Sequence, residues 1–211
     1  MCFSATASFV ASATLIPVGA YALTKAKPKD RFIALAPLLF GIQQGIEGFQ
    51  WMLVHAGHPN NYLGYAFMFF AFLFWPWFIP LSLYKAELDA KKRRLMLALL
   101  FIGVATSLGL LMVLLMTPMQ ILIHQSCLQY DVPIQLPALI PLALGYLVSA
   151  CVAPLLSSYR WVRPMGVIGL FAVIFSFVLF WTVFTSVWCF FAAALSVFCL
   201  LHVFDEKGLI K

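Results

Sequence analysis

Long apolar segments alternate with short polar connections along the whole chain. Each apolar segment is close to the 20 or so residues that an α-helix needs to cross the hydrocarbon core of a bilayer. The pattern predicts seven transmembrane helices: about Phe3–Leu23, Phe32–Val54, Tyr62–Tyr84, Leu95–Thr117 and Leu136–Leu156, with two more inside the longer run Pro164–Phe204.

The last apolar run, Pro164–Phe204, is too long for one span. As a single helix it would extend about 60 Å, whereas a bilayer with its headgroups is about 40–45 Å thick. The run must therefore fold back, and we place the turn near Thr185-Ser186, where polar residues interrupt the apolar sequence. No Gly or Pro marks this turn.

Composition supports a membrane protein and excludes an ordinary soluble domain. The 211 residues are 64% hydrophobic and only 9% charged, against about 25% charged residues in soluble domains. The net charge of +6 does not indicate nucleic acid, because the basic residues lie in short connections between apolar runs. We expect one transmembrane domain over residues 1–211.

Charge also predicts the orientation of the chain. All 13 basic residues fall in alternate connections or in the carboxyl-terminal tail, and connections rich in Lys and Arg face the cytoplasm. The amino terminus is therefore expected outside and the carboxyl terminus in the cytoplasm. The basic residues are Lys25, Lys27, Lys29, Arg31, Lys85, Lys91, Lys92, Arg93, Arg94, Arg160, Arg163, Lys207 and Lys211.

A weak internal similarity raises the hypothesis of a 3+1+3 repeat. Thr14-Leu15-Ile16-Pro17 resembles Ala138-Leu139-Ile140-Pro141, and Phe69-Phe70-Ala71 resembles Phe190-Phe191-Ala192. Parallel repeats around a central helix occur in small carriers, but apolar sequences also resemble one another by composition alone.

The second predicted helix carries the most distinctive pattern. Five residues fall within one arc of about 120° on its surface: Gln43, Gln44, Glu47, Gln50 and Trp51. Gly41, Gly45 and Gly48 lie on roughly the opposite side, where small residues allow another helix to approach closely. Because neither face suits lipid, we expect this helix at the centre of the bundle, with the serine-bearing first helix against its glycines.

Two interpretations of Glu47 remain open from the sequence. Ionisable residues inside membranes usually serve function, so Glu47 could bind a ligand or a proton in a pocket with Gln43, Gln44, Gln50 and Trp51. Alternatively, Glu47 only holds helices together through hydrogen bonds, which contribute about 0.6 kcal/mol each in membranes. Glu47 lies about 12 Å from the outer helix end, so a pocket there would open outward.

A second group of residues has the chemistry of metal ligands. Imidazole, thiolate and carboxylate bind zinc and copper, and five such candidates fall on the outer side: His55, His58, His124, Cys2 and Cys127. Their spacing is common in loops, so we assign no metal site. If they gathered around a metal, the protein would be a membrane-embedded metal-dependent enzyme. Because this alternative stays open, the sequence decides neither enzymatic activity nor a cofactor.

Three stretches resemble a known family. The opening Met1-Cys2-Phe3-Ser4-Ala5-Thr6-Ala7-Ser8-Phe9, the segment Pro37–Gln44 and Ile46-Glu47-Gly48 are similar to those of an uncharacterised family of small bacterial multi-span membrane proteins. The resemblance implies a bacterial cytoplasmic (inner) membrane location, and it supplies no activity.

Taken together, the sequence predicts an all-α integral membrane protein, a bundle of seven transmembrane helices. Its expected function is that of a small-molecule or proton-linked carrier or sensor built around Glu47. The expected partners are the lipid bilayer and a small-molecule ligand, with no nucleic acid; homo-oligomer formation is left open. The repeat and the short tail after Phe204 favour a carrier over a receptor.

Overall fold

The computed structural model describes residues 4–124, 127–133 and 136–205. Seven helical segments in this part of the chain are long and apolar enough to cross a membrane, which confirms the predicted number of helices. The elements in chain order are α1 (Ala5–Lys25), η1 (Pro28–Asp30), α2 (Arg31–His55), α3 (Asn61–Met68), η2 (Phe69–Phe74), α4 (Trp75–Ala86), α5 (Ala90–Met116), β1 (Gln120–His124), β2 (Cys127–Asp131), α6 (Leu136–Tyr146), η3 (Leu147–Val152), α7 (Ala153–Leu156), α8 (Val162–Leu179), η4 (Trp181–Val183), α9 (Phe184–Leu195) and α10 (Val197–Phe204).

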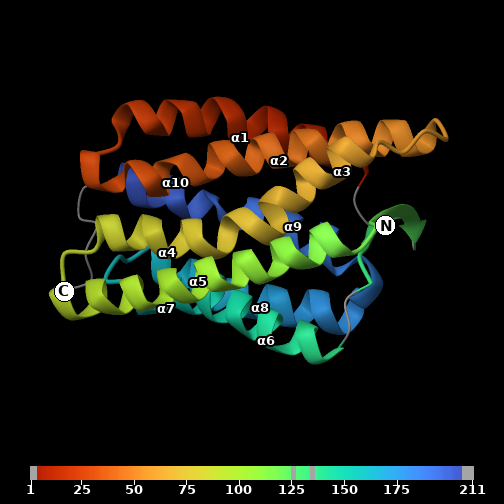
Figure 1. Cartoon of the computed structure of the whole chain (residues 1–211). Helices are drawn as coiled ribbons and strands as arrows, with labels where there is room; N and C mark the ends of the chain where they lie inside the picture. Colours follow the sequence, from red (N-terminus) through yellow and green to blue (C-terminus); the bar gives the residue numbers. More distant parts are fainter. Residues whose placement is uncertain (1–3, 125–126, 134–135, 206–211) are drawn as a thin grey trace.

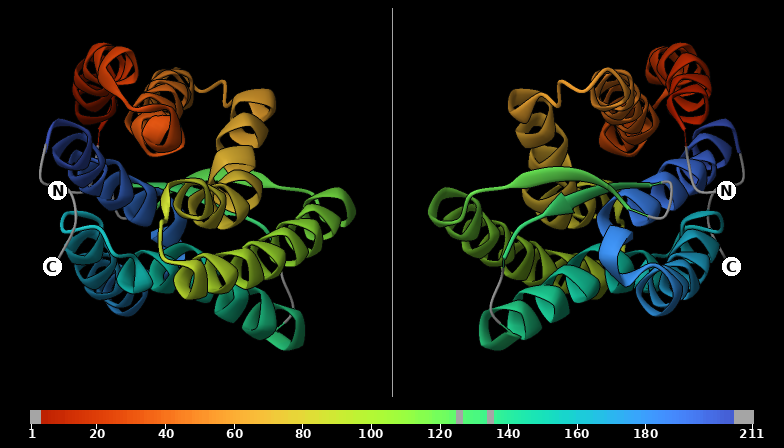
Figure 2. Two further views of the ribbon diagram at one scale, coloured as in Figure 1. Left: turned by 90° about the vertical axis from the view of Figure 1, so that its left-hand side faces the viewer. Right: turned by 90° about the vertical axis from the view of Figure 1, so that its right-hand side faces the viewer.

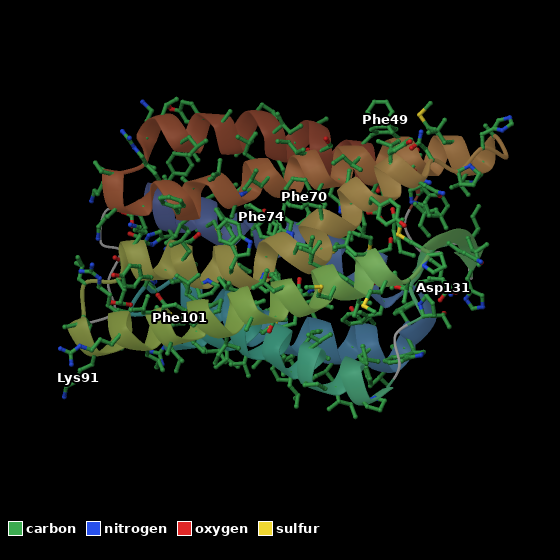
Figure 3. All side chains as sticks on the ribbon, in the orientation of Figure 1. Phe49, Phe70, Phe74, Lys91, Phe101 and Asp131 are labelled. Atoms are coloured by element: carbon green, nitrogen blue, oxygen red, sulfur yellow. The ribbon has the colours of Figure 1, made fainter. Side chains whose placement is uncertain are left out.

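The helices run roughly side by side along the long dimension of the molecule (Figure 1). One end carries the α1–α2 and α4–α5 connections, and the other carries a β-hairpin. Figure 3 labels Lys91 at the first end and Asp131 at the second. We call these the basic end and the hairpin end. Lys25, the last residue of α1, lies at the same end, as do Lys29 and Arg160 in the connections η1 and α7–α8.

Helix α2 lies beside α1 in the outer layer of the bundle (Figure 2), not at its centre as predicted, and it exposes Phe49 and Met52. It contacts α1, α3, α4, α9 and α10. Its glycine face packs against α1: a Cβ added at Gly45 would lie 2.9 Å from Ser12 Oγ, and one at Gly48 would lie 2.8 Å from the Phe9 ring. Close packing of small residues is a main source of helix association in membranes, so these glycines fix α1 against α2.

Two of the long helices change winding just before a proline. Trp75 N–H bonds the carbonyl five residues earlier, at Phe70, which makes η2 a π-helical turn; η3 is also π-helical. Pro76 and Pro154 follow these segments. A proline lacks the N–H and crowds the preceding turn of an α-helix, and a π-turn accommodates both effects.

The connection between α5 and α6 was expected as a loop, but it contains an antiparallel hairpin. Strands β1 and β2 pair with Gln120 opposite Asp131 and His124 opposite Cys127. The hairpin crosses the end of the bundle (Figure 2, right) and contacts α2, α3, α9 and η4. Leu128 and Tyr130 of β2 are buried. The hairpin therefore covers the interior from this end.

The final apolar run folds back earlier than predicted. Helix α8 ends at Leu179, and Phe180 leaves the helical region with φ −133° and ψ 37°. The predicted turn residues Thr185 and Ser186 lie instead inside α9, which begins at Phe184. Small polar residues occur both in turns and on buried helix faces, and Ser186 is of the second kind because it is 1% exposed.

Ionic and polar side chains connect the helices at the basic end. His202 Nε2 of α10 lies 3.2 Å from Asp30 Oδ1. Lys29 Nζ donates to Tyr159 Oη at 3.0 Å, and Tyr159 donates in turn to the Ala86 carbonyl. Glu87 accepts from the backbone N–H groups of Leu88, Asp89 and Ser158 at 2.9–3.1 Å. We call Asp30, His202, Lys29, Tyr159 and Glu87 the Asp30 network.

Asp89 closes the start of α5 at the same end. Its Oδ1 accepts from the backbone N–H groups of Lys91 and Lys92 at 2.9 and 2.8 Å, which is the hydrogen bonding of an N-cap. The Lys92 N–H is the main cause of a lowered pKa for this carboxyl.

Candidate functional site

Glu47 joins two helices that are far apart in sequence. Its carboxyl group is fully buried. Gln44 Nε2 donates to Oε2 at 3.3 Å from within α2, and the Ser186 hydroxyl donates to Oε1 from α9. Among the described residues, no Lys, Arg or His forms an ion pair with Glu47. The carboxyl group is therefore held only by neutral donors.

Gln43 extends the polar contact to α4. Its Oε1 accepts from Trp75 Nε1 at 2.8 Å, and both side chains are buried. The Trp75 indole stacks on Phe40 with ring centroids 3.7 Å apart. Because Trp75 directly follows the π-turn η2, the change of winding sets the position from which the indole reaches Gln43.

The remaining two predicted site residues have different surroundings. With its amide oriented so that both atoms are satisfied, Gln50 donates to the Asn60 carbonyl at 2.9 Å and accepts from the Asn60 N–H at 3.2 Å. Gln50 therefore holds the α2–α3 connection. Trp51 is 2% exposed and lies one turn beyond Glu47 on the same face of α2, with its ring 5.3 Å from that of His55.

The hairpin adds a phenol to the same region. Tyr130 of β2 is buried, and its ring stacks on Phe67 with centroids 4.6 Å apart. Burial raises the pKa of Tyr130 well above its usual value, and the nearby Glu47 charge adds to this. The phenol therefore stays protonated and can donate a hydrogen bond.

Four polar atoms in this region are buried without a hydrogen-bond partner among the described residues. They are Gln43 Nε2, Gln44 Oε1, Trp51 Nε1 and Tyr130 Oη. Buried polar groups usually have partners, because an unsatisfied donor or acceptor costs about 1–3 kcal/mol. We call the residues Gln43, Gln44, Glu47, Trp51, Tyr130 and Ser186 the Glu47 cluster. It has spare donors and acceptors beside a carboxyl group, enclosed by helices and hairpin.

The residues considered as metal ligands do not gather in the described part of the chain. No group of three or more His, Cys, Asp and Glu there could hold a metal ion. His55 Nδ1 lies 2.8 Å from the Trp51 carbonyl, and His124 Nδ1 lies 3.0 Å from Thr182 Oγ1. Cys127 is buried with Val183 and Val187. His58 is exposed, and Cys2 lies outside the described residues.

Three members of the region were missed by sequence reasoning. Ser186 was placed in a turn, and neither Trp75 nor Tyr130 was among the predicted site residues. The only local signal for Ser186 is a hydroxyl in an otherwise apolar run, which also suits a turn. Trp75 and Tyr130 give no signal for Gln43 or Glu47, since their contacts depend on the packing of distant segments.

Comparison with known proteins places the chain in a family. No curated protein and no solved structure matches the chain. Residues 1–208 match the model of a family of unknown function, DUF6629. This match covers nearly all of the sequence, and the chain therefore belongs to the family DUF6629.

Proposed function

We propose that the chain is an integral protein of the bacterial cytoplasmic membrane. In this arrangement the hairpin end faces outward and the basic end faces the cytoplasm. The seven long apolar helices support insertion, and the concentration of Lys and Arg at one end of the bundle supports the orientation. The bacterial origin rests on the sequence resemblance alone.

We further propose that the protein is a proton-linked carrier of a small polar molecule. The observation that carries this proposal is Glu47, a fully buried carboxyl group shared between α2 and α9 and surrounded by four unsatisfied polar atoms. A carboxyl group without a cation partner in a dry surrounding exchanges a proton rather than keeping a charge. The unsatisfied atoms include donors and an acceptor, so a ligand that offers both kinds of group matches them.

Coupling would act through the hydrogen bond between Glu47 and Ser186. A ligand that replaces Ser186 as the hydrogen-bond donor to the carboxyl group would alter the link between α2 and α9. Protonation of the carboxyl group would alter the same link, because it changes which hydrogen bonds the group accepts. Movement of the hairpin would open the Glu47 cluster to the outside, because Tyr130 of the cluster lies in the second strand of the hairpin. The π-turns η2 and η3 support a carrier over a fixed binding protein, since interrupted helices line the sites of many transporters.

Paired variants of Glu47 test this function. In proteoliposomes carrying a pH-sensitive dye, wild-type protein is expected to move protons when small amides, amino acids or polyols are added on one side. Glu47→Gln keeps the shape of the side chain and one acceptor oxygen, so it should fold normally and lose this flux. Glu47→Leu should also lower the free energy of unfolding by about 1 kcal/mol.

Glu47→Asp is the matched control, because it restores the carboxyl group. Partial recovery of proton flux in Glu47→Asp would support proton exchange at this position. Full activity of Glu47→Gln with an unchanged pH profile would rule out the proposal and leave Glu47 as a residue that only joins helices.

A further inference from the structure

The amino-terminal half of α8 carries a charged and apolar groove far from the Glu47 cluster. The groove is shallow, has a volume of about 490 Å³, and is lined by Arg160, Arg163, Pro164, Val167 and Ile168. Arg163, Pro164, Val167 and Ile168 follow the spacing i, i+1, i+4 and i+5 within α8, which places them on one side of the helix, and Arg160 lies in the turn just before it. The groove therefore has guanidinium groups at one end and apolar side chains along the other.

The apolar part of this face continues along α8. Phe171, Ile174 and Phe175 follow Val167 and Ile168 on the same side, and all are exposed. The distance along the helix from Arg163 to Phe175 is about 18 Å, similar to the roughly 15 Å of one leaflet's hydrocarbon core. The length of the face thus suits a single lipid chain.

The two arginines are available to an external anion. Arg160 and Arg163 are exposed, and no ion pair involves either of them in the described part of the chain. The Arg160 guanidinium lies 5.2 Å from the centre of the Trp161 ring. Trp161 Nε1 in turn donates to Asp205 at 2.8 Å, so the indole that supports Arg160 is itself held in place.

The other basic helix start at this end differs in its partners. At the beginning of α5, Lys92 donates to Ser158 at 2.9 Å and Arg93 Nη2 donates to the Tyr84 hydroxyl at 3.4 Å. These two cations are engaged by the protein's own hydroxyl groups, whereas Lys91 and Arg94 at the same helix start are exposed. At the start of α8 the exposed Arg160 and Arg163 instead line one groove together with apolar side chains.

We propose that this groove binds an anionic phospholipid of the cytoplasmic leaflet. The headgroup phosphate would lie between Arg160 and Arg163, and one acyl chain would lie along Val167, Ile168 and Phe171. Guanidinium groups suit phosphate because their planar donors match its oxygens. This inference rests on the membrane insertion and orientation proposed above, but not on proton-linked transport.

The test measures lipid preference in purified protein. Native mass spectrometry and thermal unfolding in detergent are followed as phosphatidylglycerol, phosphatidylcholine or glycerol 3-phosphate is added. Wild-type protein is expected to retain phosphatidylglycerol and to be stabilised by it more than by phosphatidylcholine. Each cation near anionic lipid strengthens binding about fivefold, so Arg160→Gln with Arg163→Gln should weaken retention about 25-fold.

Three further variants of the protein serve as controls. Arg160→Lys with Arg163→Lys keeps the charge and should keep most of the preference. Lys91→Gln with Arg94→Gln removes equal charge from exposed positions at the same end and should leave it unchanged. Glu47→Gln should also leave it unchanged, so failure of the carrier proposal is distinguishable from failure of this one.

Two results would overturn the site. Equal loss of preference in the Lys91 and Arg94 variant would mean that total charge, rather than this groove, attracts the lipid. Equal stabilisation by glycerol 3-phosphate alone would assign the arginines to free phosphate and remove the acyl-chain part of the proposal.

Discussion

Buried polar side chains join α2 to the last span at both ends of the bundle, but the two ends are built differently. At the hairpin end Glu47 meets Ser186 of α9. At the basic end Asp30, directly before α2, meets His202 of α10. The link at the hairpin end is thus a hydrogen bond from an uncharged hydroxyl group to a carboxyl group. The link at the basic end pairs an acidic with a basic side chain.

The two ends also differ in how completely their polar groups are satisfied. In the Asp30 network, Glu87 accepts three backbone N–H groups and Tyr159 both accepts and donates. Only His202 Nδ1 in that network is without a partner among the described residues. The Glu47 cluster leaves four atoms unsatisfied. A fully satisfied network makes a structure rigid, whereas unsatisfied buried groups call for an explanation, such as a partner that binds them.

The largest expected effect comes from the satisfied end. Glu87→Ala leaves three backbone donors without their acceptor and should lower the free energy of unfolding by about 3 kcal/mol, measured by thermal or denaturant unfolding in detergent. Glu87→Gln keeps an acceptor oxygen and should cost less than Glu87→Ala. A Glu87→Ala protein as stable as wild type would show that this end does not hold the bundle together.

Removal of the donor to Glu47 should have an intermediate effect. Ser186→Ala takes away the only link from α9 to the carboxyl group in the described structure, and we expect a loss of about 1 kcal/mol in unfolding free energy together with an altered pH profile of proton flux.

Ser176→Ala is the matched control for Ser186→Ala. Ser176 is equally buried, but its hydroxyl has no partner among the described residues, so its removal should be neutral or slightly stabilising. Equal behaviour of the two serine variants in both assays would contradict a special role for Ser186.

The smallest effect on stability is expected at Trp51. A variant there separates residues that stabilise the fold from residues that bind the ligand. Trp51→Phe removes an indole N–H that has no partner in the described chain, so stability should change by less than about 1 kcal/mol. The ligand-driven proton flux should nevertheless fall, because a donor to the ligand is lost.

Trp75→Phe provides the comparison for Trp51→Phe. Trp75 Nε1 already bonds Gln43, so its loss should lower stability by about 1 kcal/mol or more. If Trp51→Phe destabilised the protein as much as Trp75→Phe, the Trp51 N–H would have a structural partner and the cluster would be less open to ligand than proposed.

The sequence by itself determined the features that depend on local pattern. The length and hydrophobicity of each run fixed the number of long helices, because backbone polar groups in hydrocarbon must be satisfied within a helix. The opposite faces of α2 also predicted that both would pack against protein, since one face carries glycines for α1 and the other carries amides and Glu47. These properties follow from residues close together in the chain.

Only the tertiary structure decided which partners those faces meet. Glu47 and Ser186 are 139 positions apart, and no local pattern distinguishes a serine that turns the chain from one that donates to a buried acid. The hairpin was likewise not predicted, because its strands depend on their pairing and on the end of the bundle that they cover. Gln50 shares the polar face of α2, yet its position near the helix end gives it a backbone partner at Asn60. Contacts between distant segments depend on how all the helices pack together, and that information is not present in any single stretch of sequence.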